Sequence, residues 1–356
     1  MPAFGPSVGL RAKPPDKAGA VAAALHEWLV SGAAQSERGA FWAFCEIETG
    51  RPSFEYPEIT GYALTYIAGR PALSPAERAA GERAASWLVE RLVDGDLSAR
   101  DGWDNGAVYL FDLAMIAAGL LSFGRRIGAE RLIESGHGLA ALLRRSVDAD
   151  PSLSPVWAGG PASTRRAWST LGRAHLAKVV QALLLDELGP GEGAASLVEG
   201  VKRLQLDNGR IATGPEPTTM LHPHLYATEG LWIWGSACGD SEALERARAA
   251  IDWAFTEQLP TGGFPRSAGG SARWEQSDVT AQALRLALAV GLESTGVDRA
   301  AARLTELAFP GAEGNAIIYQ PAAARRHLNT WATLFAAQAL SAAGAGARLA
   351  YWFDLV

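Results

Sequence analysis

The stretch "RHLNTWATLFAAQAL", residues 326–340, is polar in its first turn and apolar beyond it. Its polar end holds Arg326, His327, Asn329 and Trp331, and the side chains that follow are small or aliphatic. A helix that is apolar on all sides must be buried. The stretch therefore predicts a buried helix whose N-terminal end alone reaches a polar site.

This pattern recurs along the chain at intervals of roughly fifty to sixty residues, as in proteins built from internal repeats. In each copy a Thr or Asp is followed within one or two places by a Gly or Ala, and an apolar run comes next. A single Thr near a helix start could be a simple N-cap choice, but a column of regularly spaced copies indicates a structural repeat. The column consists of Thr60, Asp112, Thr170, Thr228, Thr280 and Thr330.

Amphipathic segments alternate with the apolar ones. In "PAERAAGERAASWLVERLV", residues 75–93, apolar side chains follow one stripe and Glu and Arg lie opposite. Six buried helices surrounded by six half-exposed ones predict an all-α fold, an (α/α)6 toroid. We expect one domain over residues 1–356, with 1–16 as an irregular N-terminal segment. The expected outer helices are 17–31, 75–93, 129–146, 191–204, 241–257 and 296–308.

Composition excludes several classes of protein. The formal net charge is −6 and no basic run interleaved with aromatics occurs, so we expect no nucleic-acid partner. No apolar run approaches the roughly 20 residues of a membrane span, and the N-terminus lacks a signal-peptide pattern. Two cysteines are too few for a disulfide framework. These features favour a cytoplasmic protein. The sequence does not indicate whether the protein is a monomer or an oligomer.

The connections between the expected helices differ in length on the two sides of the ring. Those that lead into the apolar helices are long, and long loops in a compact domain usually carry function. Because all of them end at the N-termini of inner helices, we expect one shared cleft on that face, with the polar first turns inside it. The long connections are approximately 32–56, 94–106, 147–165, 205–223, 258–276 and 309–327.

Three acidic residues are the expected catalytic groups: Glu58, Asp112 and Asp278. Two carboxyl groups, one acting as general acid and one as base or nucleophile, suit glycosidic chemistry. Each has a simpler interpretation, because an acidic side chain near a helix N-terminus is favourable on its own and a buried Asp112 would need a partner. We predict Glu58 and Asp278 as the acid/base pair, supported by Asp112.

The expected substrate-binding residues are aromatic, basic or amide side chains, together with two further acids, at the same level of the ring. Aromatic faces can pack on sugar rings, and Arg, His and Asn bind hydroxyl or carboxylate groups. His222 and His224 could bind zinc with a third ligand, but none lies near in sequence, so we expect no metal and no cofactor. The predicted set is Trp103, Asp104, His224, Tyr226, Glu229, Arg266, Trp274, Arg326, His327, Asn329 and Trp331.

Short motifs resemble one group of toroid proteins. "QLDNGRIATG" (205–214) and "QLPTGGFPRS" (258–267) resemble the Gln…Gly-Gly-aromatic loops of the prenyltransferase and squalene-cyclase repeat family. "QSDVTAQAL" (276–284) resembles the Asp-Asp-Thr-Ala segment of class II terpene cyclases, which would make Asp278 their acid. The chain has no DDxxD motif, and the zinc ligands of prenyltransferases are not evident.

A second resemblance is to six-hairpin carbohydrate enzymes. "FDLAMIAAGLLSFG" (111–124) is similar to the inner-helix Asp segment of unsaturated glucuronyl hydrolase-type enzymes, which implies that Asp112 is a catalytic or sugar-binding acid. "GGFPRS" (262–267) resembles a loop of glucuronyl epimerase helical domains. Together these resemblances imply a glycoside hydrolase, lyase or epimerase acting on an oligosaccharide or a polysaccharide-biosynthesis glycan. The alternatives are a terpene cyclase-like or prenyltransferase-like enzyme acting on an isoprenoid, and a non-catalytic toroid scaffold.

Overall fold

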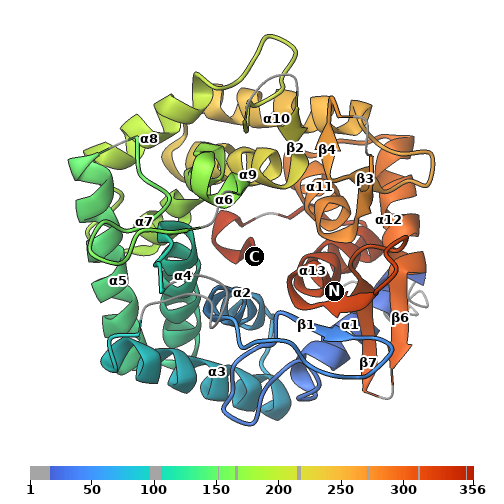
Figure 1. The fold of residues 1–356 in the computed structure, drawn as a ribbon, viewed down its shortest axis with the longest axis horizontal. Coiled ribbons are helices and arrows are strands. Elements are labelled where there is room, and N and C mark those ends of the chain that lie inside the picture. Colours follow the sequence, from blue (N-terminus) through green and yellow to red (C-terminus); the bar gives the residue numbers. More distant parts are fainter. Residues whose placement is uncertain are drawn as a thin grey trace, which may run out of the picture.

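The helices form two concentric rings (Figure 1). The computed structural model describes residues 17–96, 106–150, 152–164, 167–214, 218–270, 273–311, 313–349 and 351–356. The outer ring consists of α1 (Lys17–Val30), α3 (Pro75–Val93), α5 (Glu130–Ala149), α8 (Glu192–Lys202), α10 (Ser241–Thr256) and α12 (Thr295–Leu307). The inner ring contains α2 (Pro57–Ala68), α4 (Leu110–Ile127), α9 (Leu221–Cys238), α11 (Ser277–Val290) and α13 (Thr330–Ala345). This arrangement confirms the predicted all-α (α/α)6 toroid.

The third inner position departs from the expected continuous helix. It is divided into α6 (Trp168–Leu171), the 3-10 helix η1 (Ala174–Val179) and α7 (Val180–Leu185). Gly172 lies at the break, and glycine is a poor helix former. The hydroxyl of Thr170 bonds the backbone of Ala167, both as acceptor (3.0 Å) and as donor (3.1 Å). The third repeat therefore keeps its place along the chain but does not form one continuous inner helix.

Inner helices approach each other closely, which explains the small residues of the repeat. On α2, every residue from Pro57 to Ile67 is buried. A Cβ atom added at Gly119 of α4 would lie 2.3 Å from the carbonyl oxygen of Gly61 on α2. Real Cβ contacts are never this short, so a side chain at this crossing would force the two helices apart.

The ring is closed by its first and last helices. Outer helix α1 packs against inner helix α13, and α13 lies beside the first inner helix, α2 (Figure 1). The chain then ends at the centre of the ring (Figure 1), after the short 3-10 helix η2 (Trp352–Asp354). Leu355 and Val356 are buried, and Gln181 of α7 donates a hydrogen bond to the Leu355 carbonyl (2.8 Å). The C-terminal residues therefore occupy the axis of the toroid.

The long connections contain short strands that the sequence pattern did not reveal. β1 (Phe44–Glu46), β8 (His327–Asn329), β7 (Gly314–Ile318) and β6 (Ala308–Gly311) form one antiparallel sheet in that order. Two smaller antiparallel pairs join β2 (Thr219–Met220) to β4 (Ser267–Ala268) and β3 (Phe264–Pro265) to β5 (Glu275–Gln276). These strands fix the loops directly before the inner helices.

A repeated hydrogen bond ties each of four loops to the helix that follows it. The hydroxyl of Thr60 accepts from the Phe41 amide (3.0 Å), and that of Thr280 accepts from the Phe264 amide (3.0 Å). These two positions are the fourth residues after the N-caps of α2 and α11. The same position holds Thr333 in α13, which accepts from Ile317 N, and His224 in α9, which accepts from Ile211 N. In two helices the sequence alignment of the repeat therefore selected a neighbouring residue: Thr228 instead of His224 in α9, and Thr330 instead of Thr333 in α13.

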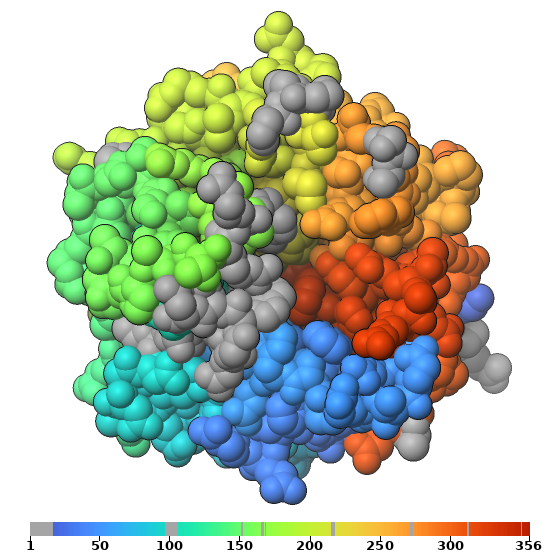
Figure 2. All heavy atoms as spheres, viewed as in Figure 1, coloured from blue at the N-terminus to red at the C-terminus, as the bar shows by residue number. Residues whose placement is uncertain are grey.

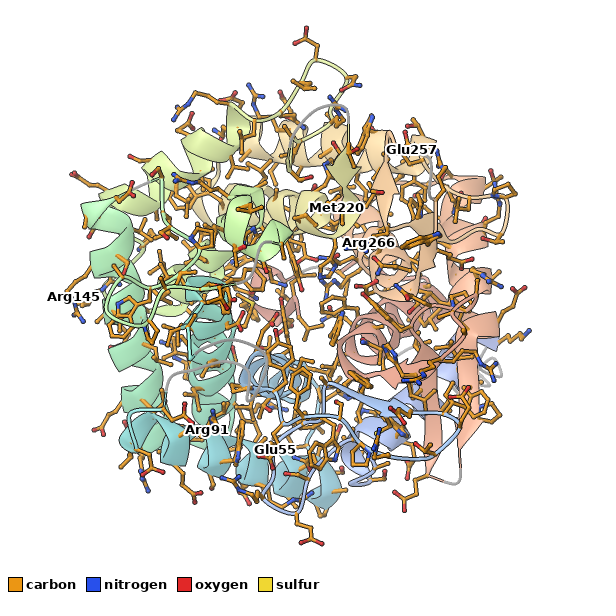
Figure 3. The ribbon with its side chains drawn as sticks, in the orientation of Figure 1. Glu55, Arg91, Arg145, Met220, Glu257 and Arg266 are labelled. Atoms are coloured by element: carbon orange, nitrogen blue, oxygen red, sulfur yellow. The ribbon has the colours of Figure 1, made fainter. Side chains whose placement is uncertain are left out.

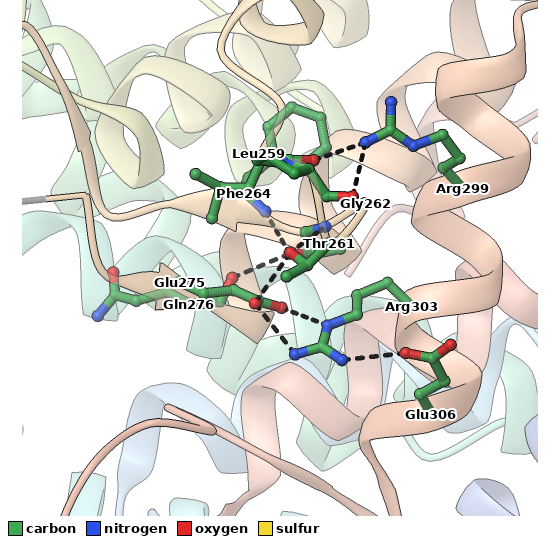
Figure 4. Close-up of polar contacts among 12 residues, drawn as sticks. Leu259, Thr261, Gly262, Phe264, Glu275, Gln276, Arg299, Arg303 and Glu306 are labelled. Carbon is green, nitrogen blue, oxygen red and sulfur yellow. Dashed lines mark hydrogen bonds and ion pairs between the residues drawn. The ribbon is translucent and has the colours of Figure 1, made fainter.

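The connection between α10 and α11 shows how a loop is fastened to the next outer helix (Figure 4). Arg299 of α12 donates to the Leu259 carbonyl (2.7 Å), and Gln258 donates to the carbonyls of Gly262 (2.8 Å) and Gly296 (2.8 Å). Gly262 has φ +90°, and a Cβ there would lie 2.6 Å from the Arg299 carbonyl oxygen. Only glycine fits such a site without strain. The same arrangement recurs for Gln35 with Gly39 and for Gln205 with Gly209.

Candidate active site

One cavity of about 360 Å³ lies at the N-terminal ends of the inner helices. Its position is the centre of the face shown in Figure 2, where the surface is hollowed. This volume is at the small end of the roughly 300–1,000 Å³ of ligand pockets. The cavity is lined by Phe44, Tyr56, Glu58, Ile59, Tyr109, Phe111, Asp112, Pro155, Ala167, Ser169, His175, Met220, His222, Tyr226, Arg266, Gln276, Tyr319, Gln320, His327 and Trp331.

Two positions near the start of the inner helices supply much of this lining: the N-cap in four of them and the second helical residue in four. The N-caps Tyr56, Tyr109, Met220 and Gln276 line the cavity, as do the second residues Glu58, Phe111, His222 and Trp331. The loop-fastening position lies two residues further along. In these helices, the residues that line the cavity and the residue that binds the preceding loop therefore occupy different positions near the helix start.

Six of the predicted site residues meet in the cavity. They are Glu58, Asp112, Tyr226, Arg266, His327 and Trp331. Glu58 and Asp112 are both nearly enclosed, at 8% and 2% exposure, and lie in the first turns of the adjacent helices α2 and α4. A helix N-terminus suits a negative charge. The cavity thus presents two carboxyl groups from neighbouring helices.

Arg266 supplies a cation to the same cavity. Its side chain is exposed and extends toward the middle of the ring, near Met220 (Figure 3). Its positive charge acts on Tyr319 of the same lining, where it opposes the rise in the pKa of the phenol that burial and Asp278 cause. Since a guanidinium binds carboxylate or phosphate through paired N–H groups, this side of the cavity is suited to an anionic group.

Histidines contribute more to the cavity than the sequence suggested. His175, which is not among the predicted site residues, lines it, and burial together with the nearby His222 lowers the pKa of His175 to about 3. Burial also lowers the pKa of His327, against an opposing effect of Asp278. The His327 ring lies between those of Phe44 (4.3 Å) and Tyr319 (5.1 Å). His175 and His327 are therefore neutral near pH 7.

His222 lines the cavity although it is absent from the predicted site residues. The sequence suggested it only as a possible zinc ligand, and in the structure it packs edge-on against Tyr226 (4.4 Å). Among the described residues no group of three His, Cys, Asp or Glu could hold a metal ion. The signal that identifies His222 is its place two residues after the N-cap Met220, equivalent to Glu58 in α2.

His224, in contrast, does not line the cavity and must be corrected to a structural role. It is fully buried, its Nδ1 accepts from the Ile211 amide (3.1 Å) and its Nε2 donates to the Ala250 carbonyl (3.1 Å). Burial lowers its pKa to about 4, so the ring is neutral. Both nitrogens are engaged with backbone, which leaves none for a substrate.

Glu229 also lies outside the cavity, in a buried ion cluster. It is fully buried, Lys178 Nζ lies 2.6 Å from its Oε2, and Arg285 and Gln282 donate to its Oε1. The two cations beside it hold the pKa of Glu229 below its usual value in spite of burial. Lys178 donates further to the Val356 oxygen (2.8 Å). Glu229 therefore joins inner helices to the C-terminal residues rather than binding substrate.

The remaining predicted binding residues are not brought into the cavity lining. Asn329 is buried as the N-cap of α13 and accepts from the Ala332 amide (2.8 Å). Trp274 is 61% exposed, and Arg326 lies 3.6 Å from Glu48 on a half-exposed surface. Trp103 and Asp104 lie outside the described residues.

Asp278, predicted as a catalytic acid, lies behind the lining instead of in it. It is 2% exposed, and its carboxylate accepts hydrogen bonds from the Val279 amide (2.8 Å) and from Trp331 Nε1 (3.3 Å). The Nδ1 atom of His222 is 3.6 Å from Asp278 Oδ2. Asp278 therefore contacts two cavity residues without facing the cavity itself.

Comparison with known proteins identifies the fold but not the family. No protein-family model matches the chain, and no curated protein matches it in sequence. Within the part of the chain that the structure describes, no helix is long and apolar enough to span a bilayer.

Solved structures with the same toroid include enzymes that act on carbohydrates and a terpene cyclase. The unsaturated glucuronyl hydrolase of Bacillus sp. GL1 is similar with a TM-score of 0.71 at 12% identity, over 95% of this chain and 98% of that one. Cellobiose 2-epimerase from Bacillus thermoamylovorans has a TM-score of 0.68 at 9% identity, over 88% and 95%. A type II terpene cyclase from Scytonema has a TM-score of 0.59 at 14% identity, over 93% and 98%. These similarities agree with both groups of resemblances found in the sequence.

Proposed function

We propose that this protein is a carbohydrate-active enzyme that binds a sugar in the central cavity and acts by carboxyl acid/base chemistry. The observation that carries the proposal is the shared position of Glu58 and Asp112 in a cavity walled by aromatic rings. One carboxyl group would donate a proton to the departing oxygen and the other would activate water or a substrate hydroxyl. This chemistry uses side chains and water and needs no cofactor.

The other lining residues support a sugar over a wholly apolar ligand. Tyr56, Phe111 and Trp331 provide ring faces for the C–H faces of a sugar, and Gln276 and His327 provide groups for its hydroxyls. Arg266 favours a substrate that carries a carboxylate, as a uronic acid does. Two of the similar structures are a glucuronyl hydrolase and a sugar epimerase, which is consistent with this substrate class.

The proposal is tested by assaying the full chain on defined sugars. An unsaturated glucuronyl disaccharide, followed by loss of its ultraviolet absorbance, and cellobiose, followed by chromatography, represent the hydrolase and epimerase reactions. We expect Glu58→Gln and Asp112→Asn each to reduce turnover about 10²- to 10⁴-fold, the usual loss of a general acid or base. Glu55→Gln is the matched control, because Glu55 pairs with Arg38 (3.2 Å) outside the cavity lining. Full activity in both cavity variants would refute the assignment.

The second candidate is an enzyme that acts on an isoprenoid, and the number of aromatic rings in the lining favours it. Phe44, Tyr109, Phe111, Tyr226 and Tyr319 could surround an apolar chain or a developing cation. The similar terpene cyclase from Scytonema is solved in complex with geranylgeranyl dihydroxybenzoate, its substrate, which supports this candidate. Incubation with geranylgeranyl-bearing substrates and product extraction distinguishes the two candidates. Saturable sugar binding without turnover would instead support the non-catalytic scaffold.

A further inference from the structure

Three consecutive inner helices bring their second residues together beside the cavity. These residues are His222 of α9, Asp278 of α11 and Trp331 of α13. His222 and Trp331 line the cavity, and Asp278 lies behind them. A single buried carboxylate therefore contacts two side chains that face the proposed substrate.

The environment of Asp278 accounts for both of its oxygens. Oδ1 accepts from the Val279 amide of its own helix (2.8 Å). Oδ2 accepts from Trp331 Nε1 (3.3 Å) and faces His222 Nδ1 (3.6 Å). Tyr319 lies beside the same carboxylate, and burial together with this carboxylate raises the pKa of the Tyr319 phenol. A buried carboxylate is costly unless its oxygens are satisfied, so these groups stabilise it where it lies. The hydrogen bond restricts the orientation of the Trp331 ring, and edge-on packing against Tyr226 (4.4 Å) restricts that of the His222 ring.

We propose that Asp278 is a positioning residue that keeps the Nδ1–H of His222 directed toward itself and leaves His222 Nε2 as a proton acceptor in the cavity. The proposal rests on the proposed function for its chemical role. During reaction a proton passes from a substrate hydroxyl or water to Nε2, so that an O–H bond breaks and an N–H bond forms. The electron pair of that bond stays on the oxygen, which attacks the substrate carbon while Glu58 or Asp112 protonates the departing oxygen. The imidazolium then stands beside the Asp278 carboxylate, and the proton returns from Nε2 to product or solvent.

The distance of 3.6 Å is longer than a hydrogen bond, yet it suits this role. Contacts in catalytic sites are often long without substrate and shorten when substrate binds. A carboxylate beside one ring nitrogen determines which nitrogen carries the proton in the neutral ring. His222 would thereby act in the cavity with Glu58 and Asp112, which come from the other side of the ring.

The test is the tautomer of His222, read from nitrogen chemical shifts in the full chain labelled with ¹⁵N-histidine. The sequence has six histidines, and His222→Gln assigns the signal. At a pH where the ring is neutral, we expect Nδ1 protonated and Nε2 unprotonated. Asp278→Asn should shift the population toward Nε2–H. The matched control Asp252→Asn, in a surface pair with Arg248 (3.1 Å), should change nothing.

A wild-type His222 with its proton on Nε2 would overturn the proposal, and so would an unchanged tautomer in Asp278→Asn. The wild-type measurement stands even if the Asp278 variant fails to fold. Because the readout needs no substrate, it is independent of the proposed function. Failure to turn over sugars would refute that function and leave the tautomer result intact. Where turnover is found, Asp278→Asn should lower kcat more than it changes KM, and the double variant with His222→Gln should lose little more than His222→Gln alone.

Discussion

Replacing Glu229 by Gln tests whether the buried ion cluster holds the centre of the toroid together. Glu229, Lys178 and Arg285 are all fully buried, and Lys178 Nζ is 2.6 Å from Glu229 Oε2. The substitution keeps the shape of the side chain but leaves two cations without a buried anion. Loss of one partner from such a cluster destabilises by about 3–5 kcal/mol.

This magnitude can be converted into a change in melting temperature. An unfolding entropy of roughly 2.1 cal/mol/K per residue over 356 residues gives roughly 0.7 kcal/mol/K. We therefore expect Glu229→Gln to lower the thermal midpoint by roughly 4–7 °C. The pKa of Lys178 is about 7, so its amine is charged below neutral pH, where the charge of Glu229 offsets the cost of burying it. The fall in melting temperature should therefore be greatest below pH 7.

The measurement is thermal unfolding followed by circular dichroism at a pH below and a pH above neutrality. Glu82→Gln is the control, since Glu82 forms an exposed pair with Arg78 (3.2 Å) worth about 0.3–0.5 kcal/mol. If Glu229→Gln melts with the wild type and the control at both pH values, the cluster contributes nothing and the electrostatic reasoning fails.

Three further changes test other parts of the fold by urea unfolding. Burial lowers the pKa of Lys178 from 10.5 to about 7, so between these two pH values the unfolded chain binds more protons than the folded one. The free energy of unfolding should therefore rise with pH from about 7 to 10.5, and Lys178→Met should abolish this rise. Thr280→Val leaves a buried loop amide without its acceptor and should cost about 1–3 kcal/mol, whereas Thr228→Val, which loses only a bond to its own helix, should cost under about 1 kcal/mol. Gly262→Ala meets a backbone carbonyl at a positive φ and should cost about 1–3 kcal/mol, while Gly138→Ala, in open space on α5, should stabilise by about 0.5–1 kcal/mol. Equal effects within either matched pair would contradict these assignments.

The helices and their alternation were predictable because periodicity extends over many residues. Each outer helix was placed within a few residues, since an apolar stripe of several turns is a strong signal. The break at Gly172 was not predictable, because Leu171, Ala174 and Leu176 flank it as they would in a helix and a single glycine is tolerated inside a helix. The short strands contain too few residues for any alternation to show.

The site was predicted at the level of helix ends and less well at the level of single residues. His222 and His224 are two places apart, and one faces the cavity while the other fastens a loop. Distinguishing them requires the N-cap, here Met220, and no capping side chain marks it in the sequence. Glu58 and Asp112 were predicted because they lie in the first turns of apolar helices, where the cleft was expected, and both line the cavity.

The contact between α1 and α13 makes the toroid different from an open stack of repeats. In an open array each added unit covers the previous one, so a fragment can be stable alone. Here any chain that stops before α13 leaves the inward side of α1 uncovered. The contact between α1 and α13 also joins the first and last long helices, which are about as distant in sequence as this fold allows. Long-range closure of this kind slows folding and leaves apolar surface exposed until late. A nascent chain of this protein is therefore vulnerable to aggregation and proteolysis until its last helix emerges.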